Sequence, residues 1–372
     1  MFQQLSAHHV ALADRSKRDF EEMLRELQTT AKTPFLKAVI PVRLWPVFRA
    51  CGFARGAVHS DPVDADSAEI LNVYAIGTSV PVFPTVPCSV VLLPISQALI
   101  RVLRLDLLHP LLMGNKWFKL KENMRVARER GYRELLTFGG AFSNHLFATA
   151  AVGKMLGWRT RGVVRGEPVS NPILDAVRAN GMRCEFWERA RYREKDAAFF
   201  ELKSRFPEAW IIPEGGANTE GVQGARDIWR HLEPHLQTHP VHLPVHLVTA
   251  CGTGSTLAGV LQGTPEHWHE QLHVHGVAVL KGADFLRQDI ARFADSRPLP
   301  HWTLHTAFHG GGYARQKQGL KDYLEQLRKA NPELPVEHVY TGKLFYGIDQ
   351  LIQQGRFEAS AVMALHTGGV YG

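Results

Sequence analysis

A lysine stands at the expected start of a helix in residues 114–120, GNKWFKL, which follow a turn at 106–110 and precede the helical pattern KENMRVARER. An ammonium group at the start of a buried helix loses hydration, so it is costly unless it is paired or used chemically. Burial and a helix N-terminus both lower the pKa of an amine, which makes Lys116 a candidate for bonding to a carbonyl carbon. The alternative is an ordinary solvated lysine.

A second loop is formed by Gly252, Thr253, Gly254, Ser255 and Thr256, after the apolar run 245–250 and before a helical pattern. Glycines let the backbone approach a ligand, and N–H groups at a helix N-terminus together with hydroxyls hold a phosphate dianion. The loop lacks the lysine of a Walker A sequence and the spacing of a dinucleotide site. It predicts a phosphate site, or else a tight strand-to-helix turn.

The third loop, residues 139–145, reads GGAFSNH and again lies between an apolar run and a helix of small residues. The amide of Asn144 can hydrogen-bond a ring hydroxyl, and Ser143 and His145 can reach a carboxylate or move protons. The alternative is that Ser143 or Asn144 only caps the helix.

The elements around these loops alternate between short apolar runs and helical patterns. Examples are LLTFGG before HLFATAAVGKMLGW, RGVVRGE before NPILDAVRANG, AWIIPEGG before GVQGARDIWRHL, and HLVTACGTGST before LAGVLQG. Such alternation predicts an α/β fold with mostly parallel sheets, and it gathers ligands at the carboxyl ends of the strands.

Composition narrows the class of protein. At 372 residues, with 45% apolar and 21% charged residues, the chain can bury a large core and should form two domains or one large domain with an appendage. The 43 basic and 36 acidic residues are interspersed, so we expect no nucleic-acid partner. No apolar stretch reaches a membrane span, and we expect no membrane partner.

The four cysteines, Cys51, Cys88, Cys184 and Cys251, are scattered without a metal-binding spacing, which favours a reducing cytoplasmic setting. The histidines in PEHWHEQLHVH, residues 265–275, form no HExxH pattern, and we interpret them as surface or loop residues. The sequence therefore predicts no metal site.

Taken together, the loops resemble those of the fold type II pyridoxal 5'-phosphate enzymes, the tryptophan synthase β-like group. Within it they are similar to the family of 1-aminocyclopropane-1-carboxylate deaminase and D-cysteine desulfhydrase. The resemblance runs from about Val90 to Gly372 and rests on RLDLLHPLLMGNKWFKL, TFGGAFSNH, PEGG, TACGTGSTLAG, GGGYA, VYTGK and LHTGG.

The resemblance implies a fold of two three-layer α/β/α domains with the cofactor in the cleft between them. The smaller domain would span about 130–212 and the larger one the rest of 90–372, after an extension, 1–89, of unknown role. It also implies a small amino-acid substrate and a homodimer.

Roles of single residues follow from the same resemblance. Lys116 resembles the cofactor lysine that later shuttles a proton, and Asn144 resembles the partner of the ring hydroxyl. Ser143 and His145 resemble the loop that binds the substrate carboxylate. The phosphate would lie on Gly252, Thr253, Gly254, Ser255 and Thr256, and the two tyrosines assisting proton transfer would be Tyr313, which also contacts substrate, and Tyr340.

Thr341 and Thr367 fall where the family surrounds the pyridine nitrogen. Deaminases have glutamate and leucine there, whereas desulfhydrases have two threonines. A carboxylate would keep the nitrogen protonated and a hydroxyl would not, so elimination of a good leaving group is favoured over opening of a cyclopropane ring. D-Cysteine desulfhydrase is thus the first expectation. Cyclopropane deamination, racemisation, another β-elimination, or cofactor binding without turnover are the alternatives.

The sequence departs from the family at Phe118, where most relatives have arginine beside the lysine motif. We expect this difference to alter the charge near Lys116.

Overall fold

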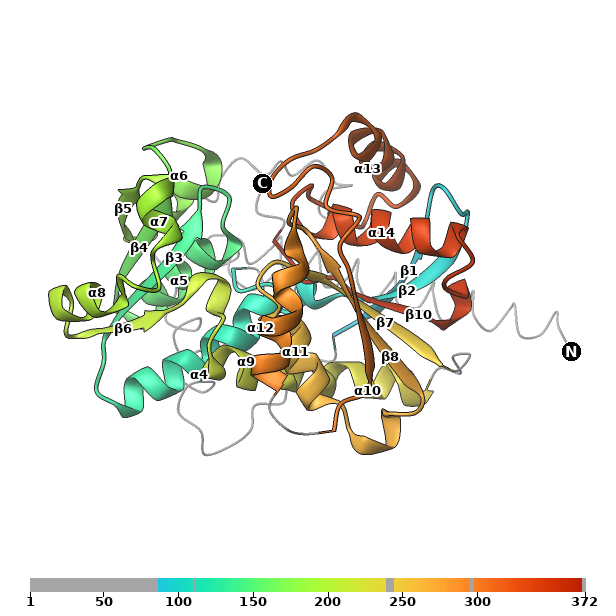
Figure 1. The fold of residues 1–372 in the computed structure, drawn as a ribbon, viewed down its shortest axis with the longest axis horizontal. Coiled ribbons are helices and arrows are strands. Elements are labelled where there is room, and N and C mark those ends of the chain that lie inside the picture. The colour runs from blue at the N-terminus through green and yellow to red at the C-terminus, as the bar shows by residue number, and fades with distance from the viewer. Residues whose placement is uncertain (1–85, 110, 239–243, 295–297, 370–372) are drawn as a thin grey trace, which may run out of the picture. The chain divides into compact units, whose positions relative to one another are not determined.

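The structure is a computed structural model, and it describes residues 86–109, 111–238, 244–294 and 298–369. Two sheets organise these residues, one of six strands and one of four (Figure 1). Most of the predicted extension, 1–89, lies outside the described residues, so its role stays open.

The six-stranded sheet has the order β1-β2-β10-β7-β8-β9. Its strands are β1 Cys88–Leu92, β2 Leu99–Leu103, β7 Val245–Cys251, β8 Leu272–Ala278, β9 His301–His305 and β10 Val362–Leu365. Only β1 and β2 pair antiparallel, and the other neighbours are parallel. The strand nearest the end of the chain, β10, is inserted between β2 and β7.

The four-stranded sheet, order β5-β4-β3-β6, is parallel throughout and comes from one continuous stretch of chain. Its strands are β3 Glu134–Gly140, β4 Arg159–Arg165, β5 Arg183–Trp187 and β6 Ala209–Ile212. Every residue of β3 is buried, as expected for an apolar strand covered on both faces.

Helices cover both faces of each sheet. They are α4 Asn115–Glu129, α5 Asn144–Leu156, α6 Pro172–Ala179, α7 Arg189–Arg193, α8 Phe199–Arg205, α9 Thr219–Ala225, α10 Trp229–Thr238, α11 Ser255–Gly263, α12 Leu286–Ala294, α13 Gln318–Ala330 and α14 Thr341–Gln353.

The buried apolar clusters show how these layers pack. On the four-stranded sheet, one cluster joins the strands to α5 and α6, and another joins them to α7 and α8. On the six-stranded sheet, one cluster includes side chains of α4, α9, α11 and α12, and the opposite one includes α13 and α14 (Figure 1). Each sheet is therefore the middle layer of an α/β/α sandwich.

The predicted fold class, α/β with mostly parallel sheets, is confirmed. All four strand-to-helix pairs read from the sequence are present, β3 with α5, β4 with α6, β6 with α9, and β7 with α11. The strands of the smaller sheet fall between Glu134 and Ile212, whereas the domain limits themselves stay a prediction. Within the described residues, no helix is both long and apolar enough to cross a membrane.

Candidate active site

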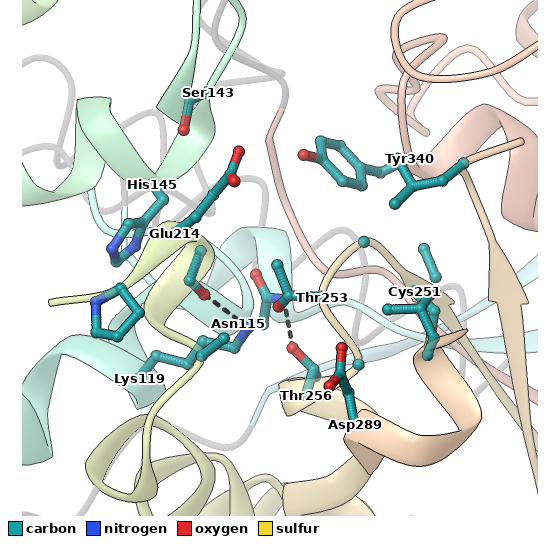
Figure 2. Close-up of a pocket in the computed structure, with 18 of the residues that line it drawn as sticks. Asn115, Lys119, Ser143, His145, Glu214, Cys251, Thr253, Thr256, Asp289 and Tyr340 are labelled. Atoms are coloured by element: carbon teal, nitrogen blue, oxygen red, sulfur yellow. Dashed lines mark hydrogen bonds between the residues drawn. The ribbon is translucent and has the colours of Figure 1, made fainter. Parts of the chain in front are cut away.

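A cavity of about 390 Å³ opens at the carboxyl ends of strands from both sheets. Its wall includes Gly140 at the end of β3, Arg165 at the end of β4, and Cys251 at the end of β7. In parallel α/β structures this edge is where ligands bind, because the loops after the strands meet there. Figure 2 shows His145 and Tyr340 approaching the cavity from opposite sides, with Thr253 and Thr256 between them.

Two distant segments meet at the base of the cavity. The backbone N–H of Asn115 donates to the carbonyl of Thr367 at 3.2 Å. Gly114, just before it, has φ +69° and ψ −149°, a conformation that essentially only glycine adopts. A Cβ on Gly114 would lie 1.8 Å from the Thr367 carbonyl oxygen, and one on Gly369 would lie 2.1 Å from Nδ2 of Asn144. Gly114 thus lets the lysine segment lie against the LHTGG segment, and Gly369 lets the LHTGG segment approach Asn144.

Lys116 lies in the first turn of α4 and lines the cavity. Its Nζ donates to Asn115 Oδ1 at 2.7 Å, and the Asn115 amide in turn donates to Thr256 Oγ1 at 2.8 Å. Burial lowers the pKa of Lys116 to about 8, and the Glu337 carboxylate acts in the opposite direction. An amine of this pKa is partly neutral near neutral pH, which a nucleophile or base requires.

Lys119 is a second lysine at the cavity, and the sequence analysis gave it no role. It lies one turn after Lys116 on the same face of α4, the i, i+3 spacing that could have revealed it. Its buried Nζ donates to the Gly215 carbonyl and to Ser255 Oγ, both at 2.9 Å. Burial, and next the charge of Lys116, hold the pKa of Lys119 well below its usual value.

The predicted phosphate loop begins directly after β7 and ends in the first turn of α11. Gly254 precedes the helix with φ +76°, so glycine is favoured there. Gly252, Thr253, Gly254 and Thr256 line the cavity, whereas the buried Ser255 hydroxyl pairs with Lys119 and with Thr253 Oγ1 at 3.0 Å. A helix N-terminus, hydroxyls and a lysine together make a site for a phosphate dianion.

The loop before α5 brings Ser143, Asn144 and His145 to the cavity. The Ser143 side chain accepts a hydrogen bond from the Leu146 N–H at 3.2 Å, so Ser143 does cap the helix. Both ring nitrogens of His145 are buried and have no hydrogen-bond partner within the part of the chain that the structure describes. Burial, then the charges of Lys116 and Lys119, hold the pKa of His145 well below its usual value, so the ring is neutral.

Tyr313 and Tyr340 meet at the cavity with ring centroids 6.1 Å apart, edge to face. Burial raises the pKa of both, and a hydrogen bond between the hydroxyls lowers that of Tyr313 and raises that of Tyr340. Both are therefore protonated near neutral pH. Buried Lys343, from VYTGK, donates to the Gly312 carbonyl at 2.7 Å and to the Val279 carbonyl, which fixes the loop carrying Tyr313 to the end of β8.

Thr341 and Thr367, which fall where the family surrounds the pyridine nitrogen, differ in position. Thr367 lines the cavity, whereas Thr341 is fully buried and does not. The Thr341 hydroxyl donates to Glu337 Oε1 at 3.0 Å, and the Glu337 carboxylate also accepts from the backbone N–H groups of Tyr340 and Thr341. A carboxylate thus lies behind Thr341, although no local pattern in the sequence indicated it.

Further charged residues line the cavity, and Arg165 and Glu214 are among them. The Arg165 guanidinium lies 5.1 Å from the ring centroid of Tyr313 and forms no ion pair with any residue in the described part of the chain. Glu214 is 3.6 Å from Lys195 Nζ. The position of Arg165 at the end of β4 is a signal that could have identified it.

Phe118 does not contact the cavity. Its side chain is fully buried in the core and packs edge-on against His231, with ring centroids 5.6 Å apart. We expected Phe118 to alter the charge near Lys116. The structure shows no contact between the Phe118 side chain and the cavity, because helix α4 directs this side chain into the core.

The fold and the site define a class of protein, a mostly parallel α/β protein whose cavity is lined by a lysine of lowered pKa and by a glycine-bearing loop at a helix N-terminus. The chain belongs to the pyridoxal-phosphate dependent enzyme family, whose sequence pattern matches residues 94–368. The resemblance inferred from the motifs is confirmed.

Curated relatives include a putative 1-aminocyclopropane-1-carboxylate deaminase of Pyrococcus abyssi, 29% identical over 275 residues, or 70% of this chain and 81% of the relative. A bifunctional D-cysteine desulfhydrase/1-aminocyclopropane-1-carboxylate deaminase of Arabidopsis thaliana is 26% identical over 70% of each chain. A D-cysteine desulfhydrase of Yersinia pestis is 25% identical over 69% of this chain and 82% of its own. A solved 1-aminocyclopropane-1-carboxylate deaminase homologue has the same fold, with a TM-score of 0.67 over 81% of this chain and 95% of its own at 23% identity.

The residues at the cavity fit pyridoxal phosphate. An amine of lowered pKa, that of Lys116, is available to the cofactor aldehyde. The Gly252–Thr256 loop and Lys119 suit the phosphate, and His145 keeps unpartnered ring nitrogens for a polar ligand. The chain is thus an enzyme of this family, and pyridoxal phosphate is its cofactor.

Proposed function

We propose that this enzyme eliminates hydrogen sulfide from D-cysteine, and that water then hydrolyses the resulting aminoacrylate to pyruvate and ammonia. The observation that carries the proposal is that Lys116, of lowered pKa, lines the same cavity as two protonated tyrosines. An elimination needs both a base at Cα and an acid at the departing group, and this arrangement supplies both.

The phosphate loop, Lys119 and Asn144 would hold pyridoxal phosphate, and Lys116 Nζ would hold its aldehyde carbon. When bound, the cofactor joins the substrate amine and withdraws electrons from Cα, which makes the Cα proton removable. Ser143, His145 and the Asn144 amide would orient the substrate carboxylate at the start of α5, where backbone N–H groups favour an anion.

Lys116 Nζ would take the proton from the substrate Cα, because its lowered pKa leaves part of the amine neutral. Tyr313 and Tyr340 would act as acids, since their raised pKa values keep both phenols protonated. In this assignment Tyr313 Oη gives a proton to the departing sulfur and recovers one from Tyr340. Arg165 would hold the Tyr313 ring in place from above.

The preference for elimination of thiol over deamination of 1-aminocyclopropane-1-carboxylate rests on Thr367, which lines the cavity, and on Thr341, which is buried and does not line it. Neither residue supplies a carboxylate, and a hydroxyl does not keep the pyridine nitrogen protonated as a carboxylate would. The deaminase activity is the second candidate, because relatives carry that name and Glu337 lies directly behind Thr341.

We also propose that the protein is a homodimer in the cytoplasm. Sedimentation velocity would measure the number of subunits.

The cofactor assignment is tested by the visible spectrum before and after borohydride reduction, followed by peptide mapping. We expect the reduced adduct on Lys116, its loss in Lys116→Arg, and its retention in the control Lys154→Arg, which changes an exposed lysine. An adduct on another lysine would contradict the assignment.

The substrate assignment is tested by supplying D-cysteine, L-cysteine and 1-aminocyclopropane-1-carboxylate separately. Pyruvate and sulfide from D-cysteine are expected, with little 2-oxobutanoate from the cyclopropane. Turnover of another amino acid but not of D-cysteine would overturn the substrate assignment and leave the cofactor assignment unchanged.

The double change Thr341→Glu with Thr367→Leu should shift activity toward deamination, and no shift would show that these positions do not select the reaction.

A further inference from the structure

Three histidines gather at the end of the six-stranded sheet opposite the cavity. His246 is the second residue of β7 and His273 the second of β8, and the parallel register places them side by side. His275 follows two residues later on β8, so it projects from the same face of the sheet. The other end of β7 lies at the cavity, five residues from His246, or about 16 Å along the strand.

The three side chains, which we call the histidine cluster, bring their ring nitrogens together. His246 Nδ1 lies 3.0 Å from His275 Nε2, and one nitrogen from each of the three rings lies within 4.8 Å of the others. In a tetrahedral zinc site with bonds of 2.0–2.1 Å, two ligand nitrogens are about 3.4 Å apart. A small rotation of the His273 ring would therefore complete a three-histidine set.

The outer nitrogens of His275 and His273 already have the partners that metal-bound histidines need. His275 Nδ1 lies 3.2 Å from His305 Nε2 on β9, and His273 Nε2 lies 2.9 Å from Thr303 Oγ1 on the same strand. Histidine ligands usually donate their second N–H to such a neighbour, which fixes the tautomer and the ring orientation. These contacts leave His275 Nε2, which lies beside His246 Nδ1, and His273 Nδ1 available to a cation.

The surroundings hold the rings in place. Phe357 stacks on His246 with centroids 4.6 Å apart at 22°, and the rings of His273 and His275 stack at 4.1 Å. His275 is buried, whereas His246 and His273 are only half-buried, which leaves room for water as a fourth ligand.

We propose that His246, His273 and His275 bind one divalent transition-metal ion, with Zn²⁺ as the first candidate. Three neutral imidazoles and a water suit Zn²⁺, as in other three-histidine zinc sites, and do not suit Mg²⁺ or Ca²⁺, which prefer oxygen ligands. The ion would tie β7 to β8, far from the cofactor, so this is a structural site independent of the amino-acid chemistry. The sequence analysis set aside His273 and His275 as surface residues, because the pairing with His246 depends on the register of two strands.

The test uses the full chain with its cofactor, treated with a chelator, dialysed, and titrated with ZnCl₂ by calorimetry. Because buried His275 could be needed for folding, the variants are His246→Gln and His273→Gln, at half-buried positions. The control is His267→Gln, which changes an exposed histidine outside the cluster. Unchanged visible absorption of the cofactor shows that each variant is folded.

We expect one equivalent of Zn²⁺ to bind the unchanged protein and the control, with an affinity at least tenfold weaker in each of the two variants. Zn²⁺ should also raise the melting temperature of the unchanged protein and the control more than that of either variant. Absence of a Zn²⁺ site in the unchanged protein, or a loss of less than tenfold in either variant, would overturn the proposal.

Discussion

Replacing Gly114 by alanine tests whether the junction between the lysine segment and the LHTGG segment is required for the site. The added Cβ would lie 1.8 Å from the Thr367 carbonyl oxygen, so the two backbones must separate by more than about 1 Å. The backbone conformation at φ +69° and ψ −149° costs a residue other than glycine about 1–3 kcal/mol. Relief of the overlap adds about 1–3 kcal/mol, so we expect a loss of stability of about 2–6 kcal/mol.

The same displacement should weaken cofactor binding at least tenfold, because Lys116 and Thr367 both move with the junction. A misplacement of about 1 Å can cost a reaction a factor of about 100. The matched control is Gly131→Ala, at φ +81° with no atom within 4 Å of the new Cβ, and it should cost only about 1–2 kcal/mol. Urea unfolding and absorbance titration with pyridoxal phosphate measure both quantities. Equal losses in the two variants, or unimpaired cofactor binding in Gly114→Ala, would refute the reasoning.

Three other outcomes follow from the site. In the cofactor-free protein, labelling of Lys116 by an amine reagent should rise with pH to a midpoint near 8, because burial disfavours the ammonium form; peptide mapping that gives a midpoint above 10 would contradict this. Lys119→Met should weaken binding of pyridoxal phosphate at least tenfold while leaving pyridoxal nearly unaffected, and equal losses would exclude a contact with the phosphate. Phe118→Arg buries a charge in the core, so the melting temperature should fall by the equivalent of about 3 kcal/mol or more; a variant as stable as the original would show that Phe118 is not a core residue.

Features that depend on neighbouring residues could be predicted from the sequence. About twenty consecutive residues encode a strand, the glycine-bearing loop after it and the following helix. The loops after β3 and β7 were therefore located correctly. The position of Lys116 at a helix start follows from the same local pattern.

Features that depend on distant pairing could not be predicted. Lys119 meets Ser255 across 136 residues, and the histidine cluster requires the register of β7 against β8. Glu337 caps α14 through backbone N–H groups, a contact with no periodic signal in the sequence. Phe118 occupies a position that the motif associates with charge, but the orientation of α4 decides that it packs in the core.

The position of β10 has a consequence for the order of assembly during synthesis. This strand is made after all the others, yet it pairs with β2 on one side and β7 on the other, in the middle of its sheet. The four-stranded sheet is contiguous in the chain and can form early, whereas the larger sheet stays split until residues 362–365 arrive. Since Thr367 lies two residues after β10, a nascent chain or one cut before this strand lacks part of the cavity wall. Tight binding of the cofactor would then require that the ribosome has synthesised the chain at least through Thr367.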